Sequence, residues 1–128
     1  MAKPSMFEGW PKTFSLPPFG AYAGVVDRVV DGDSFYAWVR GPFDHYPYLE
    51  FRLYRASSPE KNTPEGKAAK AFAEKLMPSG SRVILNAQRA DFSRTFTRYV
   101  AAVLLEDGRD LASEMVNAGH ARWGEFEG

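Results

Sequence analysis

Residues 30–39 read Val-Asp-Gly-Asp-Ser-Phe-Tyr-Ala-Trp-Val, and they indicate how the first part of the chain folds. Gly32 ends a run over 21–30 that is mainly apolar and contains several β-branched residues. After Gly32, apolar side chains alternate with polar or amphipathic ones, which is the period of a half-buried strand. The two alternating sets are Phe35, Ala37 and Val39 against Ser34, Tyr36 and Trp38. The stretch therefore predicts two strands, at 21–30 and 34–39, joined by a turn.

The segments that follow predict three more strands and two helices. Alternation resumes over 48–54 after a hairpin loop at 40–47, and two further strand-like runs cover 82–88 and 99–105. Thr63-Pro64-Glu65 is a typical helix start, with a Thr N-cap, a Pro at the first helical position and an acid in the first turn. The helix predicted over 63–77 has an apolar face made of Ala68, Ala69, Phe72, Ala73 and Leu76. A second helix begins after its cap at Asp110 and stops at Gly119.

The order β-β-β-α-β-β-α predicts a mainly β, α+β domain. It suits a five-stranded Greek-key barrel, the OB-fold, and the pattern alone also permits another α+β barrel. We expect one such domain over 21–128. Residues 1–20 form an N-terminal arm with four of the nine prolines and four aromatic residues. We expect this arm to pack on the domain, or to serve self-association or partner docking through residues 7–19.

Composition limits the classes of function. The chain has 16 basic and 16 acidic residues and a pI near 6.7, which counts against strong, general affinity for nucleic acid. A local basic stretch survives this objection, because residues 82–98 hold four arginines and one aspartate. There is no cysteine, so thiolate metal sites are excluded, and no apolar run approaches a membrane span. With no visible signal peptide we expect a cytoplasmic protein, or a secreted one if a signal has been removed.

Five side chains have the chemistry that phosphodiester cleavage requires. Asp31 and Asp33 are carboxylates that can hold a divalent cation, Glu60 is a candidate general base, and Arg52 and Arg98 are guanidinium forks. Alone, the Asp-Gly turn is an ordinary hairpin device. An EF-hand loop is excluded, because its sixth and twelfth positions would be tyrosine and proline.

The order and spacing of these residues resemble the staphylococcal nuclease (thermonuclease-like) family over about residues 21–123. The matching segments are Asp31-Gly32-Asp33-Ser34, Arg52-Leu53, Ser57-Ser58-Pro59-Glu60, a helix over 63–77, Arg98, Asp107-Gly108 and the close of the second helix at 117–121. The best-known member continues into a third helix, which we expect to be absent here. The resemblance implies the OB-fold and nuclease activity on DNA, RNA or both.

The resemblance also implies a role for each matching position. The position of Asp33 is a calcium ligand in the family, that of Asp31 supports the site, and that of Ser58 offers its backbone carbonyl to the metal. Glu60 matches the proposed general base. Arg52 and Arg98 match the arginines that bind the phosphate and its transition state. The expected cofactor is Ca²⁺, with Mg²⁺ or Mn²⁺ as alternatives.

Two departures from the family pattern concern activity. Ser57 replaces an aspartate that ligates the metal in the family, and calcium affinity depends on ligand charge. Before Arg98, the chain has Phe96-Thr97 where the family usually has Tyr-Gly. Phe96 can stack on a base, so it is a candidate substrate-binding residue. Arg94 is a second substrate-binding candidate and the rival of Arg98 for its role.

Several readings stay open. The leading one is a metal-dependent nuclease, a Ca²⁺-dependent endonuclease that leaves a 3′-phosphate as in the family. The alternatives are a non-catalytic OB module that binds nucleic acid or a protein, and a structural component that docks through the aromatic arm. Arg52 and Glu60 could also be a simple surface ion pair. We expect structural or solvent roles for the two histidines and core positions for three aromatics: His45 and His120; Trp38, Phe72 and Trp123.

Overall fold

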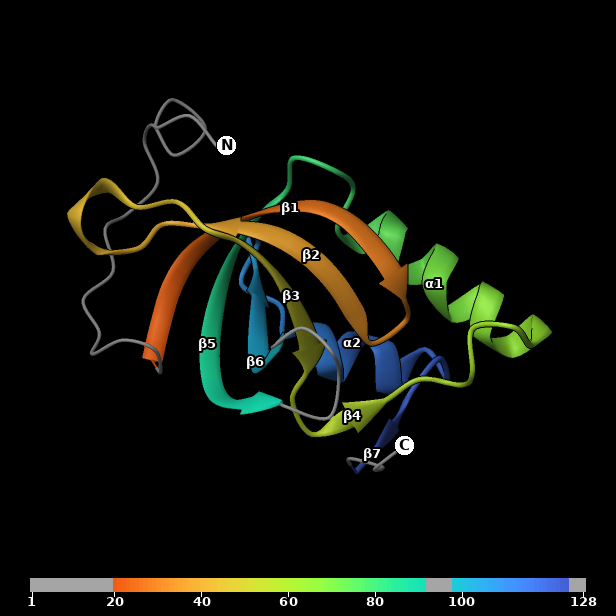
Figure 1. The fold of residues 1–128 in the computed structure, drawn as a ribbon. Coiled ribbons are helices and arrows are strands. Elements are labelled where there is room, and N and C mark those ends of the chain that lie inside the picture. Colours follow the sequence, from red (N-terminus) through yellow and green to blue (C-terminus); the bar gives the residue numbers. More distant parts are fainter. Residues whose placement is uncertain (1–19, 92–97, 125–128) are drawn as a thin grey trace.

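The structure is a computed structural model of the 128-residue chain, and it describes residues 20–91 and 98–124. Five strands form a closed barrel in the order β1-β2-β3-β6-β5 (Figure 1). Their bounds are Gly20–Asp31 for β1, Ser34–Val39 for β2, Tyr48–Leu53 for β3, Arg82–Asp91 for β5 and Arg98–Leu105 for β6. Strands β3 and β6 are parallel, and all other neighbours are antiparallel. The predicted five-stranded OB-type barrel with two helices is confirmed.

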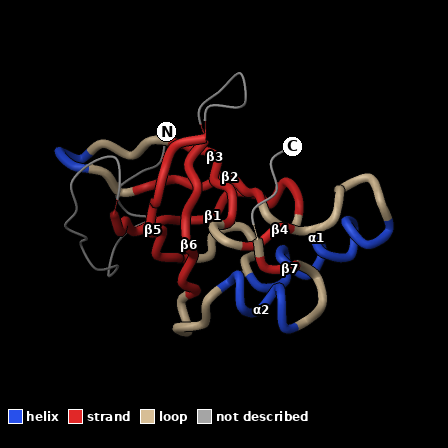
Figure 2. Tube along the Cα trace, turned by 90° about the horizontal axis from the view of Figure 1, so that it is seen from below, coloured by secondary structure: helices blue, strands red, loops and turns tan. Residues whose placement is uncertain are grey.

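The two helices lie next to each other on one side of the barrel (Figures 1 and 2). Helix α1 spans Pro64–Leu76 and α2 spans Leu111–Asn117. The predicted caps are present, because Thr63 accepts a hydrogen bond from the Gly66 amide and Asp110 accepts one from the Ser113 amide. Both helices contribute side chains to the same buried cluster as the barrel interior, namely Ala69, Ala73, Leu111, Ala112 and Met115.

The pleat of the strands separates an inner face from an outer face. Phe35, Ala37 and Val39 are buried in the core, as the alternation predicts. The cross-strand partners on the outer side pair Ser34 with Arg52, and this register places polar side chains of β2 and β3 next to each other. Two of these outer-side residues, Ser34 and Glu50, are nevertheless buried.

Some predicted positions differ from the structure. Trp123 is 54% exposed, so its expected place in the core is wrong, and Ala68 is exposed on α1. Trp38 and Phe72 are half-buried. The exposed His45 and the half-buried His120, whose ring lies 4.7 Å from that of Phe72, fit the structural or solvent roles expected of them.

A small second sheet was not predicted. Strand β4 (Ala56–Ser57) pairs with β7 (Arg122–Trp123) and ties the segment after β3 to the C-terminal part of the chain. Two residues are too few to show any hydrophobic period, which is why the sequence pattern missed both strands. The predicted arm lies almost wholly in residues 1–19, outside the described residues, and the expected loss of a third helix is not tested. In the described ranges 20–91 and 98–124, no helix has the length and apolarity needed to cross a membrane.

Candidate active site

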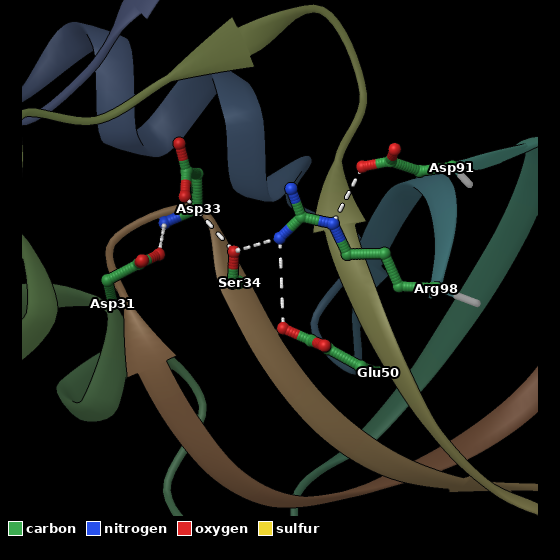
Figure 3. A network of polar contacts seen from close by, with 6 residues as sticks. All are labelled: Asp31, Asp33, Ser34, Glu50, Asp91 and Arg98. Carbon is green, nitrogen blue, oxygen red and sulfur yellow. Dashed lines mark hydrogen bonds and ion pairs between the residues drawn. The ribbon is translucent and has the colours of Figure 1, made fainter. Parts of the chain in front are cut away.

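The turn between β1 and β2 holds the two aspartates in a fixed arrangement. The Asp33 amide donates to Asp31 Oδ1 at 3.1 Å, and Asp33 Oδ1 accepts from Ser34 Oγ at 3.2 Å (Figure 3). The Ser58 amide donates to Asp33 Oδ2 at 3.1 Å. Both carboxylate oxygens of Asp33 are therefore oriented, one by its own turn and one by the loop that follows β4.

Gly32 is required here for close packing. It is not among the residues with positive φ, so its role is not the usual one of a left-handed turn residue. A Cβ atom at this position would lie 2.7 Å from Ser58 Cβ and 2.8 Å from Ala69 Cβ. The absence of a side chain lets the turn, the loop after β4 and helix α1 meet.

Glu60 is held by the start of α1. The Thr63 hydroxyl and amide both donate to the Glu60 carbonyl, at 2.7 and 3.1 Å. A Cβ at Gly66 would overlap that same carbonyl oxygen, so only glycine lets the loop lie against the helix. The backbone of Glu60 is thereby fixed, while its side chain is exposed at the pocket.

Arg98 is buried and surrounded by partners from three other segments. Its Nε donates to Asp91 Oδ2 at 2.7 Å, and its Nη1 lies 3.4 Å from Ser34 Oγ and 3.7 Å from Glu50 Oε2 (Figure 3). Figure 3 shows one network that runs from Asp31 to Arg98 through the β1–β2 turn. The remaining nitrogen, Nη2, points away from both acids in this view. Sequence reasoning missed Glu50 and Asp91, because only the barrel register brings them to Arg98.

Ser57, which replaces the aspartate expected from the family resemblance, has a structural role. Its hydroxyl accepts from Arg52 Nη2 at 3.2 Å and donates to the Gly124 carbonyl at 2.9 Å. Ser57 also pairs with Arg122 across the small sheet. The serine therefore links the β3 arginine to the C-terminal segment.

One pocket of about 770 Å³ collects these groups. All of the predicted metal and catalytic residues line it, namely Asp31, Asp33, Arg52, Ser58, Glu60 and Arg98. Two cationic side chains that sequence reasoning missed, Lys61 and Arg122, line it too. Lys61 directly follows the Pro-Glu pair, and this proximity to Glu60 was its one signal in the sequence. The predicted substrate residues Arg94 and Phe96 lie outside the described residues.

The electrostatics of the pocket centre on Asp33. Burial, followed by the neighbouring Asp31 carboxylate, raises the pKa of Asp33 to about 7. The Ser58 amide and the Arg52 guanidinium lower it, but do not compensate. Two carboxylates whose negative charges oppose each other in a half-buried turn form a place where a cation is favourable.

A family model described as "Staphylococcal nuclease homologue" matches residues 50–128. The chain belongs to the staphylococcal nuclease homologue family. A search of curated proteins found no match. The matched region contains Arg52, Glu60 and Arg98 but begins after the β1–β2 turn, so the two aspartates lie outside it. Membership supports a nuclease-like or nucleic-acid-binding domain.

The donor set of this family member fits a hard divalent cation with few protein ligands. Within residues 20–91 and 98–124, no group of three or more His, Cys, Asp or Glu is arranged to hold a metal ion. Asp31 and Asp33 are the two carboxylates of the turn that could serve as anionic donors, and the Ser58 carbonyl could be a third oxygen donor. Ca²⁺ takes roughly six to eight oxygen ligands, and Mg²⁺ is often held by one or two carboxylates together with substrate phosphates. Such a pair suits a weakly held ion whose coordination is completed by water and phosphate.

Proposed function

We propose that this protein is a metal-dependent nuclease that hydrolyses phosphodiester bonds of DNA or RNA. The observation that carries the proposal is the convergence of two carboxylates, a third acid and two arginines on one pocket from distant parts of the chain. Asp31, Asp33 and the Ser58 carbonyl would hold Ca²⁺, with Mg²⁺ or Mn²⁺ as alternatives. When bound, this cation supplies charge neutralisation at the phosphate.

The protein side chains supply the general base and the hydrogen bonds to the phosphate. Glu60 accepts the proton of the attacking water, a role that suits its exposed carboxylate at the pocket. Arg52 and Arg98 donate hydrogen bonds to the phosphate oxygens, where negative charge concentrates during attack. The hydrogen bond to Asp91 already orients the Arg98 guanidinium before the substrate binds, so less conformational entropy of this side chain is lost on binding.

The test is cleavage of a fluorogenic single-stranded DNA oligonucleotide and its RNA equivalent with Ca²⁺, with Mg²⁺ and with chelator. Glu60→Gln should lower the rate by about 10²- to 10⁴-fold, the usual contribution of a general base, without loss of folding. Glu74→Gln, an exposed glutamate of α1 away from the pocket, is the matched control. Equal rates for both variants would refute the assignment.

A non-catalytic binding module is the second candidate. Two observations favour it: Ser57 removes an anionic ligand, and two acids close to Arg98 offset its charge. A folded protein that binds oligonucleotides but cleaves none with any of the metals would establish this alternative.

A further inference from the structure

Glu50 is a buried acid that the proposed mechanism does not use. It lies on β3, is 8% exposed, and is not among the residues that line the pocket. Its Oε2 atom lies 3.7 Å from Arg98 Nη1 (Figure 3). The strand register explains this contact, because Glu50 and Arg98 each come one residue before the parallel Phe51–Tyr99 pair of β3 and β6. Glu50 therefore faces the pocket arginine from outside the pocket.

Arg98 has one more acidic neighbour than charge balance requires. On its other side, Asp91 pairs with Arg98 across the β5–β6 ladder and accepts from its Nε at 2.7 Å. Asp91 alone balances the charge of the arginine. Glu50 adds an excess negative charge in a place where burial makes an unbalanced charge costly. An ion pair that served stability alone would need only one of these acids, so the second indicates another role.

The contacts of Arg98 leave one nitrogen for a substrate. Its Nε donates to Asp91, and its Nη1 lies beside Ser34 and Glu50. None of these contacts uses Nη2, which lies on the opposite side of the guanidinium from Glu50 in Figure 3. Because Arg98 lines the pocket, Nη2 is the atom that would donate to a phosphate oxygen. A phosphate held there would lie within roughly 10 Å of the Glu50 carboxylate, since a hydrogen bond adds only about 3 Å to the guanidinium.

An excess negative charge at this distance discriminates between phosphate esters. A phosphodiester inside a strand carries one negative charge, whereas a phosphomonoester carries about −1.5 to −2 at pH 7. The Coulomb repulsion from Glu50 is therefore up to about twice as large for the monoester. Hydrolysis joins the oxygen of water to phosphorus, and one proton of that water ends on the released hydroxyl. It thereby turns a diester into a monoester, so the substrate and the product differ in charge.

We propose that Glu50 makes the pocket select phosphodiesters within a strand over phosphomonoester ends, and that it promotes release of the phosphorylated product. This inference rests on the proposed function, since it takes Arg98 as an arginine that binds the phosphate. Glu50 acts through its charge and through Arg98, and not by contact with the substrate. It is a specificity-determining residue for the pocket.

Competition binding in chelator tests the charge effect apart from cleavage. Thymidine 3′-phosphate, a monoester, and its monomethyl ester, a diester, each compete with a labelled oligothymidine followed by fluorescence anisotropy. Glu50→Gln keeps the shape of the side chain and removes its charge. It should tighten binding of the methyl ester by about 3- to 10-fold and of thymidine 3′-phosphate by about 10- to 100-fold, because doubling the charge squares the factor.

Two variants control for other causes. Glu50→Asp keeps the charge and should keep the preference of the unaltered protein for the methyl ester. Glu106→Gln removes an exposed acid outside the pocket and should change both affinities by less than about twofold, because solvent and salt screen its charge. Urea unfolding identifies any misfolded variant. The unaltered protein should itself bind the methyl ester more tightly, and the reverse order would overturn the inference without any variant.

A cleavage assay decides the nuclease proposal separately. If the protein cleaves, thymidine 3′-phosphate should inhibit Glu50→Gln more strongly than it inhibits the unaltered protein. The expected change of selectivity in a protein that does not cleave would refute the nuclease and uphold the role of Glu50. Equal tightening of both esters, weaker binding of both by folded Glu50→Gln, or no competition by either ester would overturn the role of Glu50, whatever the cleavage result.

Discussion

The substitution Asp33→Asn should make the protein more stable at neutral and alkaline pH, although it removes a proposed metal ligand. The pKa of Asp33 rises from its ordinary value of 3.8 to about 7, because the group is buried beside Asp31. Each tenfold difference in proton affinity corresponds to 1.36 kcal/mol, so ionised Asp33 destabilises the fold by at most about 4 kcal/mol. Because part of the group contacts water, we expect about 2–4 kcal/mol.

The sign follows from proton counting. Between pH 4 and pH 7 the unfolded chain has released this proton and the folded chain still holds it. The free energy of unfolding therefore falls as pH rises through this window and is level above it. Asp33→Asn lacks this dependence, since its amide stays neutral. The amide can accept from Ser58 through Oδ1 and donate to Ser34 through Nδ2, which keeps the two hydrogen bonds of Asp33.

Urea unfolding in chelator at pH 4 and pH 8 checks this prediction. The variant should exceed the unaltered protein by about 2–4 kcal/mol at pH 8, and the gain should nearly vanish at pH 4. Asp44→Asn removes an exposed carboxylate outside the pocket, in the short 3-10 helix at Pro42–Asp44, and is the control for charge removal alone. A variant that is no more stable than the unaltered protein at pH 8, or that keeps its pH dependence, would refute the reasoning. Added Ca²⁺ or Mg²⁺ should stabilise the unaltered protein at pH 8 and not Asp33→Asn.

Three further outcomes follow from the contacts in and around the pocket. Ser57→Asp restores a third carboxylate, so titration calorimetry should show tighter Ca²⁺ binding, and unchanged affinity would mean that this position does not face the ion. Gly66→Ala should lower the free energy of unfolding by several kcal/mol and slow cleavage, because the added Cβ displaces the loop that holds Glu60. Urea unfolding measures the stability and the oligonucleotide assay measures the cleavage rate. No change in either would contradict the close packing of Gly66 against the Glu60 carbonyl. Asp91→Asn removes the charge that anchors Arg98 at 2.7 Å and should cost about 1–3 kcal/mol with a lower kcat, whereas full stability and activity would show that the anchor is dispensable.

The sequence predicted a strand or helix well where that element has its own hydrophobic periodicity or its own cap. The alternation after Gly32 predicted β2, and the Thr-Pro-Glu start predicted α1 with its N-cap. Gly32 does lie in the predicted turn, but the sequence did not show why the residue there is glycine. Its backbone needs no positive φ, and the structure shows that it is required by the approach of Ser58 and Ala69. Such a reason is invisible in sequence, because both neighbours come from other segments.

The pocket residues also separate into features that the sequence predicted and features that it did not. The sequence predicted the types and order of the pocket residues Asp31, Asp33, Glu60 and the two arginines, because phosphodiester chemistry restricts which side chains can act. It did not predict their partners: the acids beside Arg98 arrive through the parallel β3–β6 pairing and the β5–β6 hairpin. The β3–β6 pairing joins residues far apart in the chain. Asp91 is only seven residues from Arg98, but their contact depends on the register of the β5–β6 pair, which no local pattern records.

The sequence by itself determined the succession of the five barrel strands and the two helices, the helix caps and the set of groups able to act on a phosphodiester. These depend on periods of two or 3.6 residues and on side-chain chemistry, which are local properties. Only the tertiary structure decided which groups meet. It closed the barrel, paired Ser57 with the C-terminal strand and placed two acids beside Arg98. The physical reason is register: the partner of each residue across a sheet is set by packing of the whole barrel and not by its neighbours in the chain.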